Sequence, residues 1–153
     1  MPLENEDSIC LPDNNFVLMN GTECFITGWG LTSWEGKQPD LLHEAKVSVV
    51  TLGECNKEFA YNFTITDRNI CAGYEEGGRD ACYKDSGGSM ACKQHGTWYS
   101  EGIVSSGFEC ARRGAYGIYT NVDALKEWVI ESILKTQDAV LQTYENHVIF
   151  DVF

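Results

Sequence analysis

At the centre of this 153-residue sequence lies the stretch Asp80-Ala-Cys-Tyr-Lys-Asp-Ser-Gly-Gly88. Ser86 stands between an aspartate and two glycines, with Cys82 four residues before it and Cys92 six residues after it. Such a turn can expose the serine as a nucleophile, because glycines permit a tight backbone whose N–H groups point at one spot. Converging N–H groups stabilise an oxyanion during acyl transfer. The stretch therefore predicts a nucleophile loop.

Composition around this loop favours a single all-β domain. The length is sufficient to bury a sizeable core, and the 43% hydrophobic and 12% aromatic content argues against disorder. The 15 glycines and the scarcity of helical periodicity before the C-terminal region are typical of strands joined by turns. The net charge of −12 argues against a nucleic-acid partner, which requires a basic surface. No apolar run is long enough for a transmembrane helix, so we expect no membrane association.

The chain has seven cysteines, and none of them form a C-x-x-C pair: Cys10, Cys24, Cys55, Cys71, Cys82, Cys92 and Cys110. A zinc or redox motif is therefore not predicted, and we expect no metal or cofactor. Cysteines scattered among β segments indicate disulfides and an extracellular, oxidising location. The N-x-T acceptors at Asn20 and Asn62 are consistent with a secreted glycoprotein. Residues 1–7 do not have the features of a signal peptide.

Alternating and apolar segments predict the secondary structure. We expect strands at 23–30, 41–52, 69–73, 90–93, 97–100, 102–107 and 116–122, and a short helical turn within 53–63. The three- and four-residue spacing of Leu125, Trp128, Val129 and Ile133 predicts a helix from about 123 to 135. Residues 136–153 show a mixed pattern that predicts no definite element.

The order and spacing of several motifs resemble the second half of a trypsin-like serine protease domain. The matching segments are Ile9–Pro12, Thr27–Gly30, Leu42–Val50, Asn69–Gly73, Asp80–Gly88, Gly102–Ser105 and Gly117–Val122. The family fold is two antiparallel Greek-key β-barrels, so the resemblance implies the second barrel with a C-terminal helix. The implied organisation is an interdomain segment at 1–15, the barrel with its helix at 16–135, and an extension at 136–153.

The resemblance also implies three disulfides, Cys24–Cys92, Cys55–Cys71 and Cys82–Cys110. Cys10 is left over. In family members with an upstream pro-segment or light chain, the corresponding cysteine tethers that piece. The alternative is that Cys10 is a free thiol.

The family's functional positions map onto this sequence. Ser86 corresponds to the nucleophile, and the N–H groups of Lys84 and Ser86 correspond to the oxyanion hole. Asp80 corresponds to the carboxylate at the base of the specificity pocket, which selects Arg or Lys in a protein or peptide substrate. Three further positions match the pocket walls: Ser105, Gly107 and Gly117. The alternative for Asp80 is a solvated loop residue.

Other positions bear on whether the loop is active. Asp85 corresponds to the aspartate that pairs with the new N-terminal amine after zymogen cleavage. The family places the catalytic His and Asp in the first barrel, upstream of the Cys10 region, so we expect neither in this chain. Lys84 stands where the family has glycine, Ser106 replaces a tryptophan, and Glu109 stands where trypsin has glycine.

Three interpretations remain open at this point. The chain is the C-terminal half of a secreted endopeptidase that cleaves after Arg or Lys and is inactive without a first barrel. It is a non-catalytic, protease-like binding module, for which the altered residues near Ser86 and the missing base argue. Or it is a truncated product without a stable fold, whose surface facing the first barrel would be an exposed apolar patch.

Overall fold

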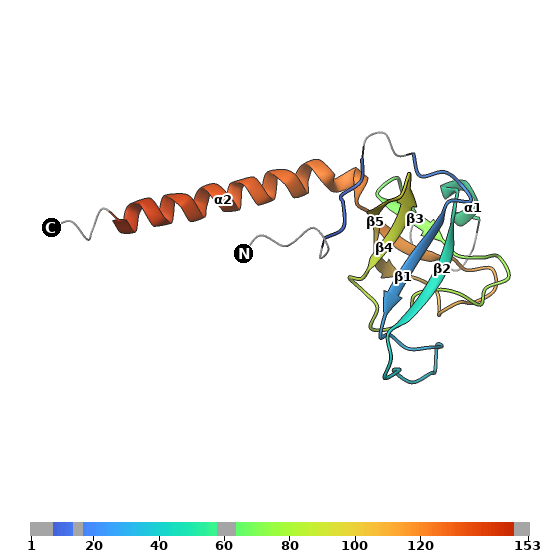
Figure 1. Cartoon of the computed structure of the whole chain (residues 1–153). Coiled ribbons are helices and arrows are strands. Elements are labelled where there is room, and N and C mark those ends of the chain that lie inside the picture. Colours follow the sequence, from blue (N-terminus) through green and yellow to red (C-terminus); the bar gives the residue numbers. More distant parts are fainter. Residues whose placement is uncertain (1–7, 14–16, 58–63, 149–153) are drawn as a thin grey trace.

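The computed structural model describes residues 8–13, 17–57 and 64–148, and it shows an antiparallel barrel that is closed in the order β1-β2-β3-β6-β5-β4 (Figure 1). Its strands are β1 (Glu23–Gly28), β2 (His43–Val50), β3 (Asn69–Ala72), β4 (Ser89–Gln94), β5 (Thr97–Ser106) and β6 (Gly117–Asn121). This confirms the predicted all-β barrel. Closure gives each strand of the barrel two neighbours, and the part of the β5 edge at Tyr99 pairs instead with Cys10.

Alternation along the strands directs one set of side chains into the barrel. In β2, Val47 and Val49 are buried, whereas the residues between and beside them are more exposed. The core cluster contains Cys24, Ile26, Val47, Val49, Ile70, Ala72, Met90, Cys92 and Tyr119. Burial of such apolar surface contributes about 25 cal/mol per Å², so this cluster is the main source of stability for the barrel.

The sequence predicts separate strands at 97–100 and 102–107, and this is wrong, because β5 runs unbroken from Thr97 to Ser106. Gly102 lies inside the strand, where it serves close packing. A Cβ atom at this position would lie 3.0 Å from atoms of Met90 and Tyr119. The strand deviates later, where the register against β6 shifts between Val104 and Ser106.

Three disulfides join the pairs that the resemblance implies, Cys24–Cys92, Cys55–Cys71 and Cys82–Cys110. Cys10 is free and exposed. Its backbone extends the barrel, because Cys10 N–H donates to Trp98 O at 3.2 Å and Cys10 O accepts from Ser100 N–H at 2.9 Å.

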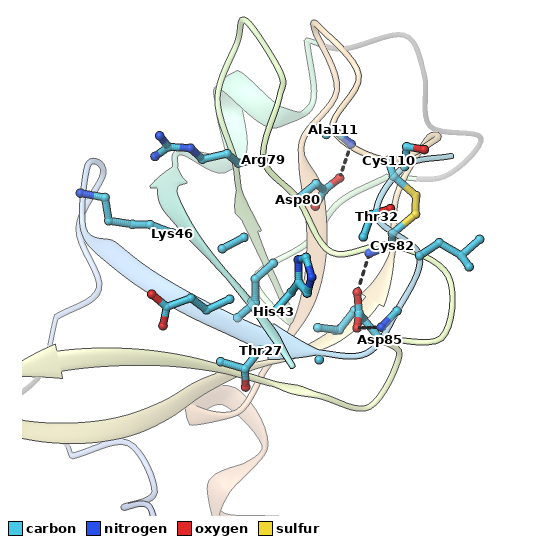
Figure 2. A pocket seen from close by; sticks show the side chains of 18 of the residues that line it. Thr27, Thr32, His43, Lys46, Arg79, Asp80, Cys82, Asp85, Cys110 and Ala111 are labelled. Atoms are coloured by element: carbon cyan, nitrogen blue, oxygen red, sulfur yellow. Dashed lines mark hydrogen bonds between the residues drawn. A yellow bond between two sulfur atoms is a disulfide. The ribbon is translucent and has the colours of Figure 1, made fainter. Parts of the chain in front are cut away.

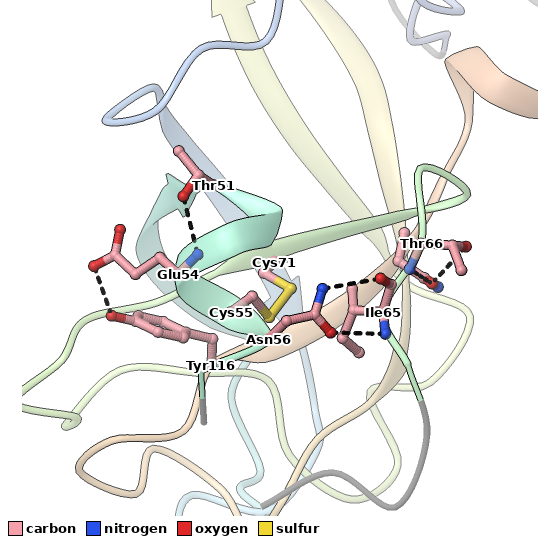
Figure 3. Close-up of a disulfide and its surroundings, with 9 residues drawn as sticks. Thr51, Glu54, Cys55, Asn56, Ile65, Thr66, Cys71 and Tyr116 are labelled. Atoms are coloured by element: carbon pink, nitrogen blue, oxygen red, sulfur yellow. Dashed lines mark hydrogen bonds between the residues drawn. A yellow bond between two sulfur atoms is a disulfide. The ribbon is translucent and has the colours of Figure 1, made fainter. Parts of the chain in front are cut away.

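The Cys55–Cys71 disulfide fastens a short helix, α1 (Leu52–Cys55), to β3 (Figure 3). The Thr51 hydroxyl caps the helix by accepting from Glu54 N–H at 3.1 Å, and Tyr116 Oη donates to the Glu54 carboxylate at 3.3 Å. The predicted helical turn is therefore confirmed at its start. Residues 58–63, which include the acceptor Asn62, lie outside the described part of the chain.

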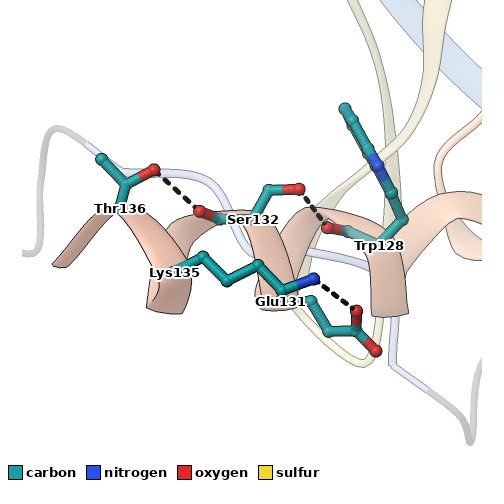
Figure 4. A network of polar contacts seen from close by, with 5 residues as sticks. All are labelled: Trp128, Glu131, Ser132, Lys135 and Thr136. Atoms are coloured by element: carbon teal, nitrogen blue, oxygen red, sulfur yellow. Dashed lines mark hydrogen bonds and ion pairs between the residues drawn. The ribbon is translucent and has the colours of Figure 1, made fainter. Parts of the chain in front are cut away.

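A 3₁₀ turn, η2 (Asp123–Leu125), leads into α2 (Lys126–Val148), which projects away from the barrel (Figure 1). The helix is longer than the predicted 123–135 and extends into the region for which the sequence predicts no definite element. On its first turns, Lys135 pairs with Glu131 at 3.3 Å, and the hydroxyls of Ser132 and Thr136 donate to the carbonyls four residues earlier (Figure 4). No helix in the described ranges has the length and apolar character needed to cross a membrane.

Candidate active site

The loop that carries Ser86 is fixed by its own backbone and by β5. Asp85 N–H donates to Cys82 O at 3.0 Å, Gly88 N–H donates to Asp85 O at 2.9 Å, and Gly87 N–H donates to Val104 O at 2.9 Å. Gly87 has a φ of 87°, a conformation that glycine adopts at little cost. These constraints leave the Ser86 side chain exposed at the loop surface.

A cavity of about 270 Å³ opens beside Ser86, and we call it the Ser86 pocket. Its lining includes every residue that the sequence assigns to substrate binding: Asp80, Ser105, Gly107 and Gly117. These residues come from the loop before Ser86, from β5 and the residue that follows it, and from the start of β6, so the closed barrel brings them together. The pocket combines an exposed hydroxyl with a carboxylate.

The carboxylate of Asp80 is largely buried in the pocket wall. Its Oδ1 accepts from Ala81 N–H at 2.8 Å, and its Oδ2 accepts from Ala111 N–H at 3.2 Å. Burial raises the pKa of Asp80 from 3.8 to about 6, against the opposing effect of the two N–H donors, and the nearby Asp85 carboxylate raises it slightly further. A cationic group entering the pocket would favour the ionised form and reverse this shift.

The glycines of the pocket differ in how strictly they are needed. A Cβ atom at Gly117 would collide with Asp80 Oδ1 and lie 3.2 Å from the ring and hydroxyl of Tyr119. At Gly107, a Cβ atom would be 3.5 Å from Glu109 O, which is an ordinary contact. The absence of a side chain at Gly117 therefore keeps Asp80 accessible from the pocket.

Tyr119 is a core residue that lies beside Gly117 and does not line the Ser86 pocket. Its hydroxyl is buried and has no hydrogen-bond partner within the described residues. Burial, and then the charges of Asp80 and Asp85, raise the pKa of Tyr119 above its usual range. The phenol therefore stays protonated. Its place in an apolar strand pattern gives no signal that it lies near these two carboxylates.

Lys84 has a φ of 78°, the left-handed conformation that favours glycine. Its ammonium group turns away from the pocket and donates to Gln38 Oε1 at 2.8 Å. The neighbouring Tyr83 contacts Trp34, with 5.1 Å between the ring centroids, and both rings line the Ser86 pocket. The 31–40 loop is thus attached to the nucleophile loop, a contact that the sequence analysis does not predict.

Asp85 lies in a second cavity, of about 480 Å³, that also reaches Asp80 (Figure 2). Its carboxylate accepts from Gly30 N–H at 2.8 Å and from Cys82 N–H at 3.0 Å. A Cβ atom at Gly28 or Gly30 would collide with this carboxylate, which explains why glycine occupies both positions. Two backbone N–H groups thus donate to the Asp85 carboxylate. This carboxylate takes part in none of the ion pairs found among the described residues.

The two histidines whose side chains are described, His43 and His95, are not arranged as partners of Ser86. His43 lines the Asp85 cavity (Figure 2), and His95 lies in the turn between β4 and β5. Neither of them lines the Ser86 pocket. The side chain of His147 lies outside the described residues. Within the part of the chain that is described, no cluster of His, Cys, Asp or Glu is arranged to hold a metal ion.

The chain is similar to a known protein family and to a known protein. A family model described as Trypsin matches residues 3–129. Coagulation factor XI of Bos taurus is 41% identical over 129 residues, which cover 84% of this chain and 20% of that protein. The family match therefore includes the barrel, the loop that carries Ser86 and the first residues of α2, and this chain spans a small part of the relative's length.

Proposed function

The chain belongs to the trypsin family of serine proteases, and from this premise we propose that it is the C-terminal half of an endopeptidase that cleaves after Arg or Lys. The observation that carries the proposal is the Ser86 pocket, in which an exposed serine and a buried carboxylate share one cavity. The carboxylate of Asp80 suits the cationic end of an Arg or Lys side chain, because its burial leaves it in need of a positive partner.

The proposed chemistry is acyl transfer. Ser86 Oγ attacks the scissile carbonyl while a histidine of the first barrel removes its proton, and the N–H groups of Lys84 and Ser86 receive the oxyanion. The histidine then protonates the leaving amine, and water hydrolyses the acyl-enzyme. Because triad members act as a unit, this chain without a first barrel is expected to be inactive.

Other features support a larger, extracellular protein. Large apolar side chains are exposed at Trp29, Leu41 and Leu42, in the segment between β1 and β2, as expected of a region that a first barrel would cover. The exposed thiol of Cys10 is suited to a disulfide with an upstream segment. Asp85, whose carboxylate lies in a cavity, would pair with the amine formed on zymogen cleavage. Three disulfides favour an oxidising compartment, in which Asn20 would be glycosylated.

A second candidate, a protease-like binding module without catalysis, is favoured by Lys84. Glycine at this position would adopt a φ of 78° freely, whereas lysine costs about 1–2 kcal/mol there. A module would still use the Asp80 pocket to bind a cationic side chain. The two candidates differ in whether Ser86 reacts once a base is supplied.

The experiment compares the chain alone with the chain co-expressed with a first barrel of the family. We expect no Ser86-dependent hydrolysis of an arginine ester by the chain alone. In the complex we expect a serine-directed phosphonate to label wild-type protein but not the Ser86→Ala variant. A stable complex in which Ser86 stays unlabelled would support the binding module instead.

A further inference from the structure

A third cavity, of about 530 Å³, lies at the opposite end of β6 from the Ser86 pocket. Gly117 at the start of this strand lines the Ser86 pocket, whereas Asn121 at its end lines the third cavity. Four steps along a strand separate the two positions by about 13 Å. Three acidic side chains line the third cavity, Asp67, Glu101 and Asp123, and we call it the acidic cavity.

Glu101 is the unusual member of this group. It lies in β5 with only 3% of its surface exposed, and its Oε1 is buried without a hydrogen-bond partner among the described residues. Burial raises the pKa of Glu101 to about 7. The charge of Asp123 adds to this rise and that of Lys126 opposes it. Nearly all buried acceptors in proteins are satisfied. Glu101 therefore combines a place in the cavity lining with an unpaired oxygen that is itself shielded from solvent.

The surrounding charges favour a cation as the ligand of this cavity. Asp67 and Asp123 are exposed at the rim. Lys126 is the cation that forms an ion pair with an acidic residue of this cavity. Its ammonium group pairs with Asp123 Oδ1 at 3.2 Å and donates to Pro12 O at 3.0 Å. Of the described residues that line the cavity, three are acidic and none is basic, so the cavity is electronegative. Lys126 lies outside this lining and is paired with Asp123.

The rest of the lining favours an organic cation over a metal ion. Val17 and Leu52 provide an accessible apolar surface, since Val17 is 69% exposed and Leu52 is half-buried. The long stems of Lys and Arg pack well on such a surface while their charged ends reach polar groups. The described residues contain no group of three His, Cys, Asp or Glu that is arranged to hold a metal.

We propose that the acidic cavity binds a Lys or Arg side chain from a basic segment of a protein partner. The side chain's stem lies against Val17 and Leu52, and its charged end donates to the carboxyl groups of Glu101 and Asp67. This surface shares no lining residue with the Ser86 pocket. The proposal therefore stands whether or not Ser86 is catalytic.

The test uses the full, unglycosylated chain, so that Asn20 at the cavity wall is bare. The probe is an acetylated and amidated peptide of alternating Gly and Arg, and the matched control peptide has citrulline in place of Arg. Amide chemical shifts in NMR spectra report where the peptide binds. We expect shifts at Asn69 and Asn121 that saturate with the Arg peptide, weaken with salt and are absent with the citrulline peptide.

Variants separate the two acidic sites. Glu101→Gln keeps the side-chain shape and is expected to weaken binding at Asn121 about tenfold, since charge-assisted hydrogen bonds are lost. Asp67→Asn, at the exposed rim, is expected to weaken binding at Asn121 about threefold, and it is the variant to use if Glu101→Gln does not fold. Asp80→Asn should leave binding at Asn121 unchanged. Shifts confined to Ser105 and Gly117, or equal affinity in wild type and both cavity variants, would overturn the proposal.

Discussion

The substitution Asp80→Asn is expected to reverse its effect on stability between acidic and alkaline pH. Burial raises the pKa of Asp80 from 3.8 in its ordinary state to about 6 in the folded protein. The folded state therefore keeps this proton to a higher pH than the unfolded state. The resulting stabilisation is complete below about pH 4 and is lost as the pH rises through 6. A pKa rise of this size corresponds to about 3 kcal/mol.

Asparagine has no charge to bury, but it cannot accept both hydrogen bonds that the Asp80 carboxyl group accepts from Ala81 and Ala111. Losing one acceptor costs about 1 kcal/mol. The variant should therefore be about 1 kcal/mol less stable than wild type at pH 4 and about 2 kcal/mol more stable at pH 8. Glu101 titrates in both proteins, so its effect cancels in the comparison.

The free energy of unfolding is measured by urea denaturation, followed by tryptophan fluorescence, at pH 4, 6 and 8. Asp40→Asn, which changes an exposed carboxylate in the 31–40 loop, is the matched control and should show no such reversal. If the difference between wild type and Asp80→Asn is the same at pH 4 and pH 8, burial does not penalise the charge of Asp80. The proposed need of the pocket for a cation would then lose its physical basis.

Three further predictions concern the loop, the core and the pocket wall. Lys84→Gly relieves the φ of 78° and should raise the free energy of unfolding by about 1 kcal/mol, so a loss of stability in urea would contradict the strain. Replacing Cys24 and Cys92 by Ala opens a loop of 68 residues and should cost about 4 kcal/mol in the same assay, against about 3 kcal/mol for the disulfide that closes 16 residues. Gly117→Ala puts a methyl group against the carboxylate of Asp80 and should abolish binding of acetyl-arginine amide to the Ser86 pocket, as measured by calorimetry. Unchanged affinity would show that the ligand does not reach Asp80.

Local patterns in the sequence predict much of the barrel. The alternation around Val47 places a strand where β2 lies, and the motif ending in Gly30 marks the end of β1. These patterns fail where contacts with distant segments of the chain decide which residue fits. The sequence predicts a break at Glu101, but β5 continues through Glu101 and Gly102. Met90 and Tyr119 pack so closely around Gly102 that a side chain would not fit there. Helix α2 is also longer than the spacing of its apolar residues predicts.

By itself, the sequence predicted a nucleophile loop around Ser86, and its resemblance to trypsin-like proteases implied the three cysteine pairs that the structure contains, because motifs at fixed spacing identify a family whose fold imposes the pairing. Only the tertiary structure decided which side chains meet across the barrel. It placed Trp34 against Tyr83, turned Lys84 towards Gln38, and buried the carboxyl groups of Asp80 and Glu101. Burial and proximity arise from strand closure between distant segments, and they set the pKa of a carboxyl group more strongly than its neighbours in the chain do.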